Sequence, residues 1–364
     1  MNENDLLARI RLIRSQSIGP VTFRQLLLRF GSAEAALRAV PDLAARGGGR
    51  LPALCTEAAA RAEMTRVEKL GGRYLTVGQG LYPRLLAEAD DAPPLLTALG
   101  DLTLLDRPLV AMVGARNASA AACRFARSLA HELGREGQVV VSGLARGIDA
   151  AAHEGSLETG TIGVIAGGLD IFYPPENERL QRTLGERGLV LAEMPPGTEP
   201  RARHFPYRNR IIAGVSAGTV VVEAAPRSGS LITARLAAEM GREVMAVPGS
   251  PLDLRAQGCN GLIRDGATLV QNAGEVLGAL RPGLGGVRSG RDLFSHPSAP
   301  AVVEPDSAER ARVEELLGPS PAPVDEIVRL SGLEPGAVQL VLLELDLAGR
   351  LDRHAGGKVS LRMA

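Results

Sequence analysis

The chain has 364 residues, of which 45% are hydrophobic, 23% charged and 3% aromatic. This composition is typical of a folded soluble protein and excludes a collagen, a disulfide scaffold and a disordered chain. Lysine plus arginine and aspartate plus glutamate both total 41, so the net charge of zero gives no overall indication of nucleic-acid or membrane binding. All the cationic side chains except Lys69 and Lys358 are arginines, whose planar groups suit phosphates and stack on bases.

The sequence predicts a cytoplasmic protein without a membrane partner. No apolar run approaches the roughly 20 residues that span a bilayer, and the first residues do not resemble a secretory signal. Cys55, Cys123 and Cys259 are far apart and lack histidine or cysteine at metal-ligand spacing. They are therefore predicted to be reduced, and no metal site is expected.

Residues 1–80 are predicted to form a small helical module. Apolar residues recur at helical spacing in residues 5–15, and Ile18-Gly19-Pro20 interrupts the pattern before a second helix. The turn is similar to that of a helix-hairpin-helix, and the segment carries 12 basic and 7 acidic residues. Because such turns are common and the excess charge can belong to a solvated face, a structural role is favoured over DNA binding.

Residues 81–281 predict a doubly wound, Rossmann-like α/β core. Short β-branched runs alternate there with helical stretches, which is typical of a parallel sheet covered on both faces. The runs are residues 109–114, 138–143, 161–167, 188–193, 218–224 and 243–249, and a further edge strand and helix are expected before residue 281.

Residues 282–306 are rich in glycine, proline and serine and predict a linker, and residues 307–364 predict a winged helix. Ser331-Gly332 would be the turn before its third helix, and Gly356-Gly357 the tip of the wing. A third helix that reads DNA should be basic, but none of its residues before Arg350 is basic, and the segment from Asp306 to the end carries 10 acidic and 7 basic residues. An interaction or regulatory role is therefore favoured over a transcription factor.

Three strands of the predicted core end at residues 113–117, 141–149 and 166–170, and the second and third of these strand ends are glycine-rich turns. Successive amides near a helix N-terminus bind anions, and Ser142 and Arg146 add a hydroxyl and a charge. A phosphate is the expected ligand. The alternative for Gly143 or Gly147 alone is a tight turn that needs a positive φ.

Cofactor and enzyme signatures are absent from these turns. The first turn is not G-x-G-x-x-G, no Walker sequence occurs, and no G-x-S-x-G follows a strand, so no nucleotide cofactor is predicted. Asp149, Asp170, Glu193 and Glu223 lie near strand ends, where carboxylates often cap helices or orient loops. Structural roles are favoured over an acid/base pair, and the protein is predicted not to be an enzyme.

Residues 196–214 contain the most informative segment, in which four arginines and His204 surround Phe205 and Tyr207. Cations interleaved with aromatic rings are typical of single-stranded nucleic-acid binding, because the cations pair with phosphates while rings stack on bases. The alternative is that the two rings are core anchors and Asn209 caps a helix. For the basic group as a whole, binding is favoured.

The strings VGAR, VSGLARGIDAAAH, VIAGGLD, FPYRNRIIAGVS, SGSLITA and GCNGLIRDGA occur in this order over residues 111–267. This combination resembles the DNA-processing protein A (DprA/Smf) family. The resemblance implies a homodimer that binds single-stranded DNA during natural transformation, loads the RecA recombinase, antagonises single-strand-binding protein and has no catalytic turnover. A phosphoribohydrolase-like, nucleotide-processing enzyme remains the alternative, although its motif PGGxGTxxE does not occur.

The turns and the resemblance together predict one groove for phosphates and single-stranded DNA. Its predicted residues are Arg116, Ser142, Gly143, Ala145, Arg146, Gly147, Gly167, Gly168, Arg203, His204, Phe205, Arg208, Asn209 and Arg210. Many members of the family have a lysine in the segment that corresponds to residues 173–177, which has none here, so either Arg179 replaces it or that contact is missing. Dimer and RecA contacts are expected in the late sheet region, around residues 231–240.

Overall fold

The computed structural model describes residues 2–280, 304–354 and 356–362. These residues form two compact units: a core unit of residues 63–280, and a terminal unit in which residues 2–62 pack with residues 304–362. The predicted linker lies outside the described residues, except for its last three positions. None of the helices in the described ranges is long and apolar enough to cross a membrane.

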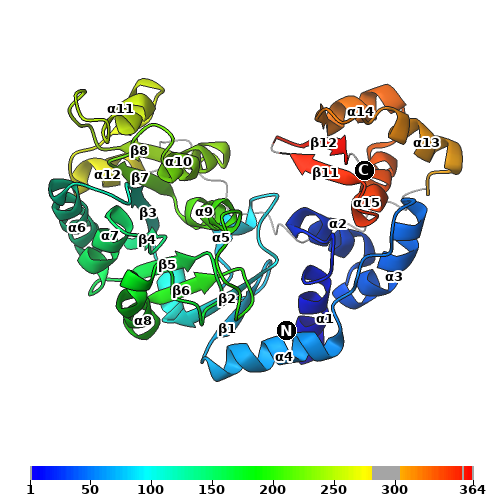
Figure 1. The fold of residues 1–364 in the computed structure, drawn as a ribbon, viewed down its shortest axis with the longest axis horizontal. Coiled ribbons are helices and arrows are strands. Elements are labelled where there is room, and N and C mark those ends of the chain that lie inside the picture. The colour runs from blue at the N-terminus through cyan, green and yellow to red at the C-terminus, as the bar shows by residue number, and fades with distance from the viewer. Residues whose placement is uncertain (1, 281–303, 355, 363–364) are drawn as a thin grey trace. The chain divides into compact units, whose positions relative to one another are not determined.

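The core unit contains a nine-stranded sheet in the order β1-β2-β6-β5-β4-β3-β7-β8-β9 (Figure 1). All six predicted strand runs form strands, and they pair in parallel with one another. The Rossmann-like prediction is therefore confirmed for these strands. The strands are β1 (Arg73–Thr76), β2 (Leu95–Gly100), β3 (Leu109–Gly114), β4 (Val139–Ser142), β5 (Thr161–Ile165), β6 (Leu189–Ala192), β7 (Gly218–Val222), β8 (Glu243–Ala246) and β9 (Thr268–Leu269).

One edge of the sheet carries two antiparallel strands that the sequence did not predict, and β1 lies within residues 1–80, which were predicted to be helical. β1 pairs antiparallel with β2, and β2 pairs antiparallel with β6. The chain leaves helix α4 (Glu57–Lys69) through Gly71, whose φ of +73° favours glycine, and then enters β1. A four-residue strand shows too little periodicity to identify, so its pairing partner decides its conformation.

Helices cover both faces of the sheet, because alternate strand residues point to opposite sides. Val110 and Val140 pack with α6 and α7, whereas Ala111 and Val141 pack with α9. The helical segments of the core unit after α4 are α5 (Arg84–Ala87), the 3-10 helix η1 (Leu102–Asp106), α6 (Ala120–Arg135), α7 (Ile148–Ser156), the 3-10 helix η2 (Pro175–Asn177), α8 (Glu178–Arg187), α9 (His204–Val215), α10 (Gly229–Glu239), α11 (Gln257–Arg264) and α12 (Ala273–Leu280).

The sheet has a topological switch point at β3. From β3 the chain runs outward through β4, β5 and β6 in one direction, and later through β7, β8 and β9 in the other. In open sheets of this kind, ligands bind outside the carboxyl ends of the strands where the order reverses. The loop after β3 therefore occupies the position where a binding site is expected, and the loop after β4 follows the neighbouring strand.

The terminal unit confirms the predicted helical module and the winged helix. Helix α14 ends at Ser331 before the left-handed Gly332, and the wing turns at Gly356 and Gly357. A three-stranded sheet in the order β10-β12-β11 forms the wing. The elements are α1 (Glu3–Ile13), α2 (Pro20–Phe30), α3 (Ala33–Arg46), α13 (Ser307–Glu315), β10 (Ala322–Pro323), α14 (Val324–Ser331), α15 (Pro335–Leu347), β11 (Leu351–His354) and β12 (Lys358–Leu361), with α4 beginning in this unit and ending in the core unit.

Candidate nucleic-acid interface

A cavity of about 200 Å³ lies among the loops after β3 and β4, the segment at η2 and the start of α9. Six of the predicted groove residues line it. This volume is smaller than the roughly 300–1,000 Å³ of sites that enclose drug-sized ligands, so the cavity suits part of a nucleotide rather than a dinucleotide cofactor. The lining residues are Arg116, Gly143, Ala145, Arg146, Tyr173, Pro174, Pro175, Glu176, Phe205 and Arg208.

Phe205 is the centre of a group of aromatic and cationic side chains. The guanidinium carbon of Arg116 lies 5.3 Å from the centre of the Phe205 ring, and the ring of Tyr173 lies 5.6 Å away, tilted by 55°. Arg116 and Tyr173 are exposed, and Phe205 is half-buried. A base stacked on these rings would have its phosphates next to the Arg116 charge.

The loop after β4 is held in shape by Asp149. One carboxylate oxygen of Asp149 accepts hydrogen bonds from the amides of Gly143 (3.1 Å) and Ala145 (3.3 Å). Gly147 has a φ of +75°, and a Cβ atom there would overlap the carbonyl oxygen of Ala115. The protein's own carboxylate thus occupies two of the amides that were predicted to hold phosphate, while the exposed Arg146 supplies the charge of this loop.

Arg208 and Arg210 point into the protein rather than toward solvent. Arg208 is 6% exposed and donates from Nη1 to the carbonyls of Gly143 and Val164. Arg210 is 4% exposed and donates from Nη2 to Oε1 of Glu193 at 2.6 Å. Both arginines were predicted groove residues, and the structure gives each of them bonds inside the core unit.

Asp149, Arg208 and His153 are three buried titratable side chains, and the charge of Arg208 affects the pKa of the other two. Burial lowers the pKa of Arg208 to about 10, against the raising effect of Asp149. Burial also raises the pKa of Asp149, although Arg208 and the two loop amides oppose this. The pKa of His153 is lowered to about 3 by burial and by Arg208. His153 is therefore neutral at physiological pH.

His153 is held by a hydrogen bond to Thr161. Nδ1 of His153 lies 2.7 Å from the hydroxyl oxygen of Thr161, and the same hydroxyl lies 3.1 Å from the carbonyl of Val140. The neutral imidazole is thus fixed between α7 and β5 by a polar contact inside the core unit.

Three other predicted residues are buried and hold neighbouring backbone segments in place. The hydroxyl of Ser142 donates to the carbonyl of Met112 at 2.6 Å. Gly167 and Gly168 allow the segment at 195–198 to approach closely, because a Cβ atom on either would lie 2.8 Å or less from a carbonyl oxygen of that segment.

The remaining predicted residues lie at the start of α9. Arg203 is exposed at the N-cap of α9. The ring of His204 accepts a hydrogen bond from the amide of Arg201, and burial together with Arg203 and Arg201 lowers its pKa. Asn209 is half-buried and donates to the carbonyl of Gly229 at 3.4 Å. Of these three side chains, Arg203 presents its charge to solvent.

The strand-end carboxylates bind loops and arginines. Asp170 accepts from the amide of Gly197 at 2.6 Å, and Glu223 accepts from both the amide and the hydroxyl of Ser119 at 2.7 and 2.6 Å. Asp149 accepts from the two loop amides after β4, and Glu193 accepts from Arg210. The geometry places all four in supporting positions around the loops.

Four lining residues were not predicted from the sequence, and Tyr173 is the aromatic one; the others are Pro174, Pro175 and Glu176. Residues 173–177 were not included in the predicted groove because they contain no lysine, yet the ring of Tyr173 lies beside Phe205 and is 47% exposed. Next to it, Glu176 forms an ion pair of 3.6 Å with Arg146. An aromatic residue soon after the glycine turn at the end of β5 was the available signal.

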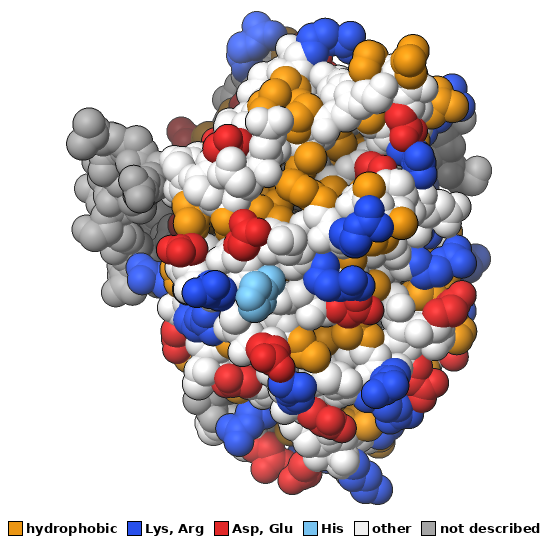
Figure 2. All heavy atoms as spheres, turned by 90° about the vertical axis from the view of Figure 1, so that its left-hand side faces the viewer, with side chains coloured by type: hydrophobic (Ala, Val, Ile, Leu, Met, Phe, Trp, Pro, Cys, Tyr) orange, Lys and Arg blue, Asp and Glu red, His pale blue; other side chains and the backbone are white. Residues whose placement is uncertain are grey.

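One face of the core unit carries charges of both signs. Figure 2 shows basic and acidic side chains interspersed over the face that looks left in Figure 1, with hydrophobic side chains gathered in its upper part. That face therefore presents no continuous basic field.

Comparison with known proteins gives three consistent matches. The family described as DNA recombination-mediator protein A matches residues 73–281, a DprA-like N-terminal HHH domain matches residues 3–65, and a DprA winged helix domain matches residues 297–357. The chain is 45% identical over 240 residues to DNA processing protein DprA of Streptococcus pneumoniae, which covers 65% of this chain and 85% of that protein.

Two solved structures are also similar. DprA from Streptococcus pneumoniae superposes with a TM-score of 0.64 at 38% identity, over 76% of this chain and 98% of that one. DNA processing protein A from Helicobacter pylori superposes with a TM-score of 0.52 at 31% identity, over 57% of this chain and 95% of that one. The Helicobacter pylori structure is described as giving insights into the unique single-stranded DNA binding mode of that protein.

Proposed function

The chain belongs to the DNA recombination-mediator protein A family, and on this basis we propose that it binds single-stranded DNA at the carboxyl edge of its core sheet. One observation carries the proposal: Phe205 and Tyr173 lie together beside the exposed Arg116 and Arg146 around a small cavity. A base stacks on the rings, and the two arginines bind the adjoining phosphates.

The chemistry of this group favours a single strand over a duplex. A ring face is useful only to a base that has left its stack, and bases of a single strand are free to do so. The zero net charge also favours a single strand, because duplex binding without base contacts relies on many phosphate contacts. The related Helicobacter pylori structure with a single-stranded DNA binding mode supports this choice.

The finer roles follow from membership of the family. The protein acts in the cytoplasm as a homodimer during natural transformation, protects incoming single strands, antagonises single-strand-binding protein and loads RecA. No catalytic turnover is proposed, since the strand-end carboxylates bind loops and arginines.

The binding site is tested by two arginines of matched exposure. Arg146 and Arg187 have side chains that are 55% and 53% exposed, and each forms one ion pair with a glutamate. Arg146 lines the cavity, whereas Arg187 ends α8 just before β6, at the amino edge of the sheet. We expect Arg116→Ala and Arg146→Ala each to weaken oligo-dT binding about tenfold in fluorescence anisotropy, and Arg187→Ala to change it less than twofold. Equal losses in all three variants would refute the site.

A salt series tests whether the cavity arginines bind phosphates. For the wild type, the logarithm of the affinity should fall linearly with the logarithm of the salt concentration, and each cavity variant should have a shallower slope.

Recombinase loading is tested by RecA filament formation on single strands coated with single-strand-binding protein. Release of free base from nucleoside monophosphates would instead establish the phosphoribohydrolase-like enzyme.

A further inference from the structure

Helix α15, the third helix of the winged helix, contributes to two hydrophobic cores. Nine of its thirteen residues are buried. Val338, Val341 and Leu345 pack inside the winged helix, whereas Leu340 and Leu343 pack against the N-terminal helices. A helix that is apolar on two sides is an interior helix rather than a surface helix.

The N-terminal helices supply the second core. Phe23 and Leu26 of α2 and Val40 and Leu43 of α3 are at most 3% exposed and belong to the same cluster as Leu343. These residues come from the opposite end of the chain. The two modules that were predicted as separate domains therefore share one interior within the terminal unit.

Two glycines let the backbones meet at the end of α15. A Cβ atom on Gly47 would overlap the carbonyl oxygen of Glu344, and one on Gly49 would overlap that of Ala348. Neither glycine has a positive φ, so the close approach alone explains the need for glycine.

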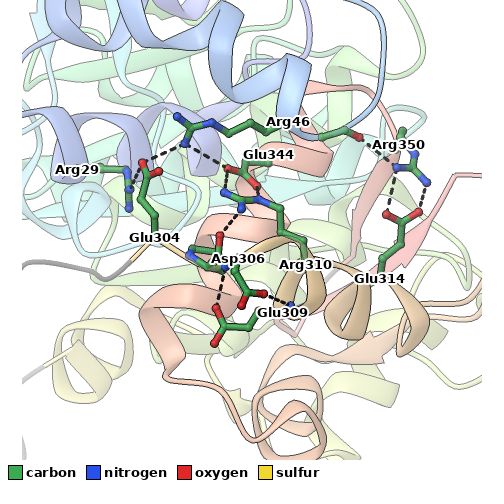
Figure 3. Close-up of polar contacts among 11 residues, drawn as sticks. Arg29, Arg46, Glu304, Asp306, Glu309, Arg310, Glu314, Glu344 and Arg350 are labelled. Atoms are coloured by element: carbon green, nitrogen blue, oxygen red, sulfur yellow. Dashed lines mark hydrogen bonds and ion pairs between the residues drawn. The ribbon is translucent and has the colours of Figure 1, made fainter.

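An ion-pair network around the buried Glu344 joins the two modules (Figure 3). The Glu344 side chain is 1% exposed and accepts two bonds from Arg310 of α13, at 2.8 and 3.0 Å. Arg46 of α3 lies 3.8 Å from Glu344 and also donates to Glu304 at 3.0 Å. Cations from both modules thus surround one buried carboxylate, which would be costly to leave unpaired.

Further polar bonds join the two modules. The hydroxyl of Thr22 donates to Asp346 at 2.7 Å, and Nη1 of Arg350 donates to the carbonyl of Gly47 at 3.1 Å. Arg350 also forms an ion pair with Glu314. Apolar packing, close backbone contact and paired charges all occur at the same interface, as in a specific interface rather than a loose contact.

We infer that α15 is an internal docking helix whose partner is the N-terminal helical module of the same chain, residues 2–62. In DNA-binding helix-turn-helix proteins the corresponding helix lies in the major groove and reads base edges. Here its surface is occupied, and its charged residues are the acidic Glu344 and Asp346. The winged helix and the N-terminal module are one folding unit, and α15 does not read duplex DNA.

The inference is tested by cutting the full chain. A site-specific protease sequence is inserted between residues 285 and 300, the chain is cleaved, and the fragments are separated by size exclusion. We expect the C-terminal fragment of the wild type to remain bound to the remainder, and to stay bound on dilution. Separation of the wild-type fragments would refute the inference, and retention only at concentrations where the chain dimerises would assign the helix to a second copy.

Two kinds of variant locate the contact. Gly47→Ala combined with Gly49→Ala should release the fragment, while Gly19→Ala and Gly318→Ala, where a Cβ atom meets open space, should retain it. Because the double variant also strains the module itself, Glu344→Gln is the second probe, with an expected loss of about a hundredfold in affinity between the fragments. Retention of the fragment by both probes would show that the core unit holds it, and would refute the inference.

Discussion

The guanidinium carbon of Arg116, after the first parallel strand, lies 5.3 Å from the centre of the Phe205 ring at the start of α9. Residues from two distant parts of the chain thus form one surface for a base and its phosphate. The energy of such a surface is divided between stacking and charge. The first prediction separates the two contributions.

Phe205→Ala should weaken binding of oligo-dT by about tenfold to a hundredfold, because base–aromatic stacking contributes about 1–3 kcal/mol per base. Tyr207→Ala is the matched control: this ring is 53% exposed on the same helix but does not line the cavity, so its loss should change affinity less than twofold. Phe205→Leu, which keeps an apolar side chain without a stacking face, should bind like Phe205→Ala. Fluorescence anisotropy at constant salt measures the affinity of all three variants. A larger loss of affinity for Tyr207→Ala than for Phe205→Ala would assign the stacking of bases to Tyr207.

Gly147→Ala should reduce single-strand binding, because the new Cβ atom would overlap the carbonyl oxygen of Ala115 and displace the loop that carries Arg146. Gly137→Ala provides the comparison. Its φ of +86° imposes a similar backbone cost of roughly 1–2 kcal/mol, but its Cβ atom meets open space. Both variants should be destabilised in urea unfolding, and only Gly147→Ala should lose affinity. Equal affinities would show that the loop conformation is unimportant for binding.

Asp149→Asn should destabilise the core unit by about 1–3 kcal/mol, since it removes the buried negative charge that accepts from the amides of Gly143 and Ala145 and interacts with the charge of Arg208. Urea unfolding followed by circular dichroism measures the change. The exposed pair of Asp253 and Arg255 is the control, and Asp253→Asn should leave the unfolding midpoint nearly unchanged. A small effect of Asp149→Asn would mean that backbone carbonyls alone satisfy Arg208.

Acid should destabilise the core unit through His153. The pKa of His153 is lowered from 6.5 to about 3 in the folded protein, so between these values the unfolded chain binds a proton that the folded chain does not. Stability therefore falls as the pH falls through this range. His153→Asn keeps a hydrogen-bonding group for Thr161 but removes the titrating group. Between pH 7 and pH 5 the wild type should lose about 2 kcal/mol more than this variant in urea unfolding.

The contribution of Asp149 has the opposite sign, because a carboxyl group with a raised pKa binds more protons when folded. Asp149 is present in both proteins, so its contribution largely cancels in the comparison. Identical pH dependence of the wild type and His153→Asn would contradict the neutral, buried imidazole.

The parallel strands were predictable from the sequence because strands buried on both faces consist of nearly continuous apolar residues. β3 matches its predicted limits at both ends, Leu109 and Gly114. β1 and β2 were missed because short antiparallel edge strands depend on their partners more than on their own residues. The winged helix was recognised from its turns, whereas the burial of its third helix depends on residues about 300 positions away in the chain.

The residue types around the candidate site are readable from the sequence: glycines at the turns, arginines and Phe205 on the basic segment. Which of these arginines face solvent depends on the fold. Arg116, Arg146 and Arg203 are exposed, whereas Arg208 and Arg210 are buried. The physical reason is that a buried guanidinium needs carboxylates and carbonyls around it, and these come from distant strands and loops that the fold brings together.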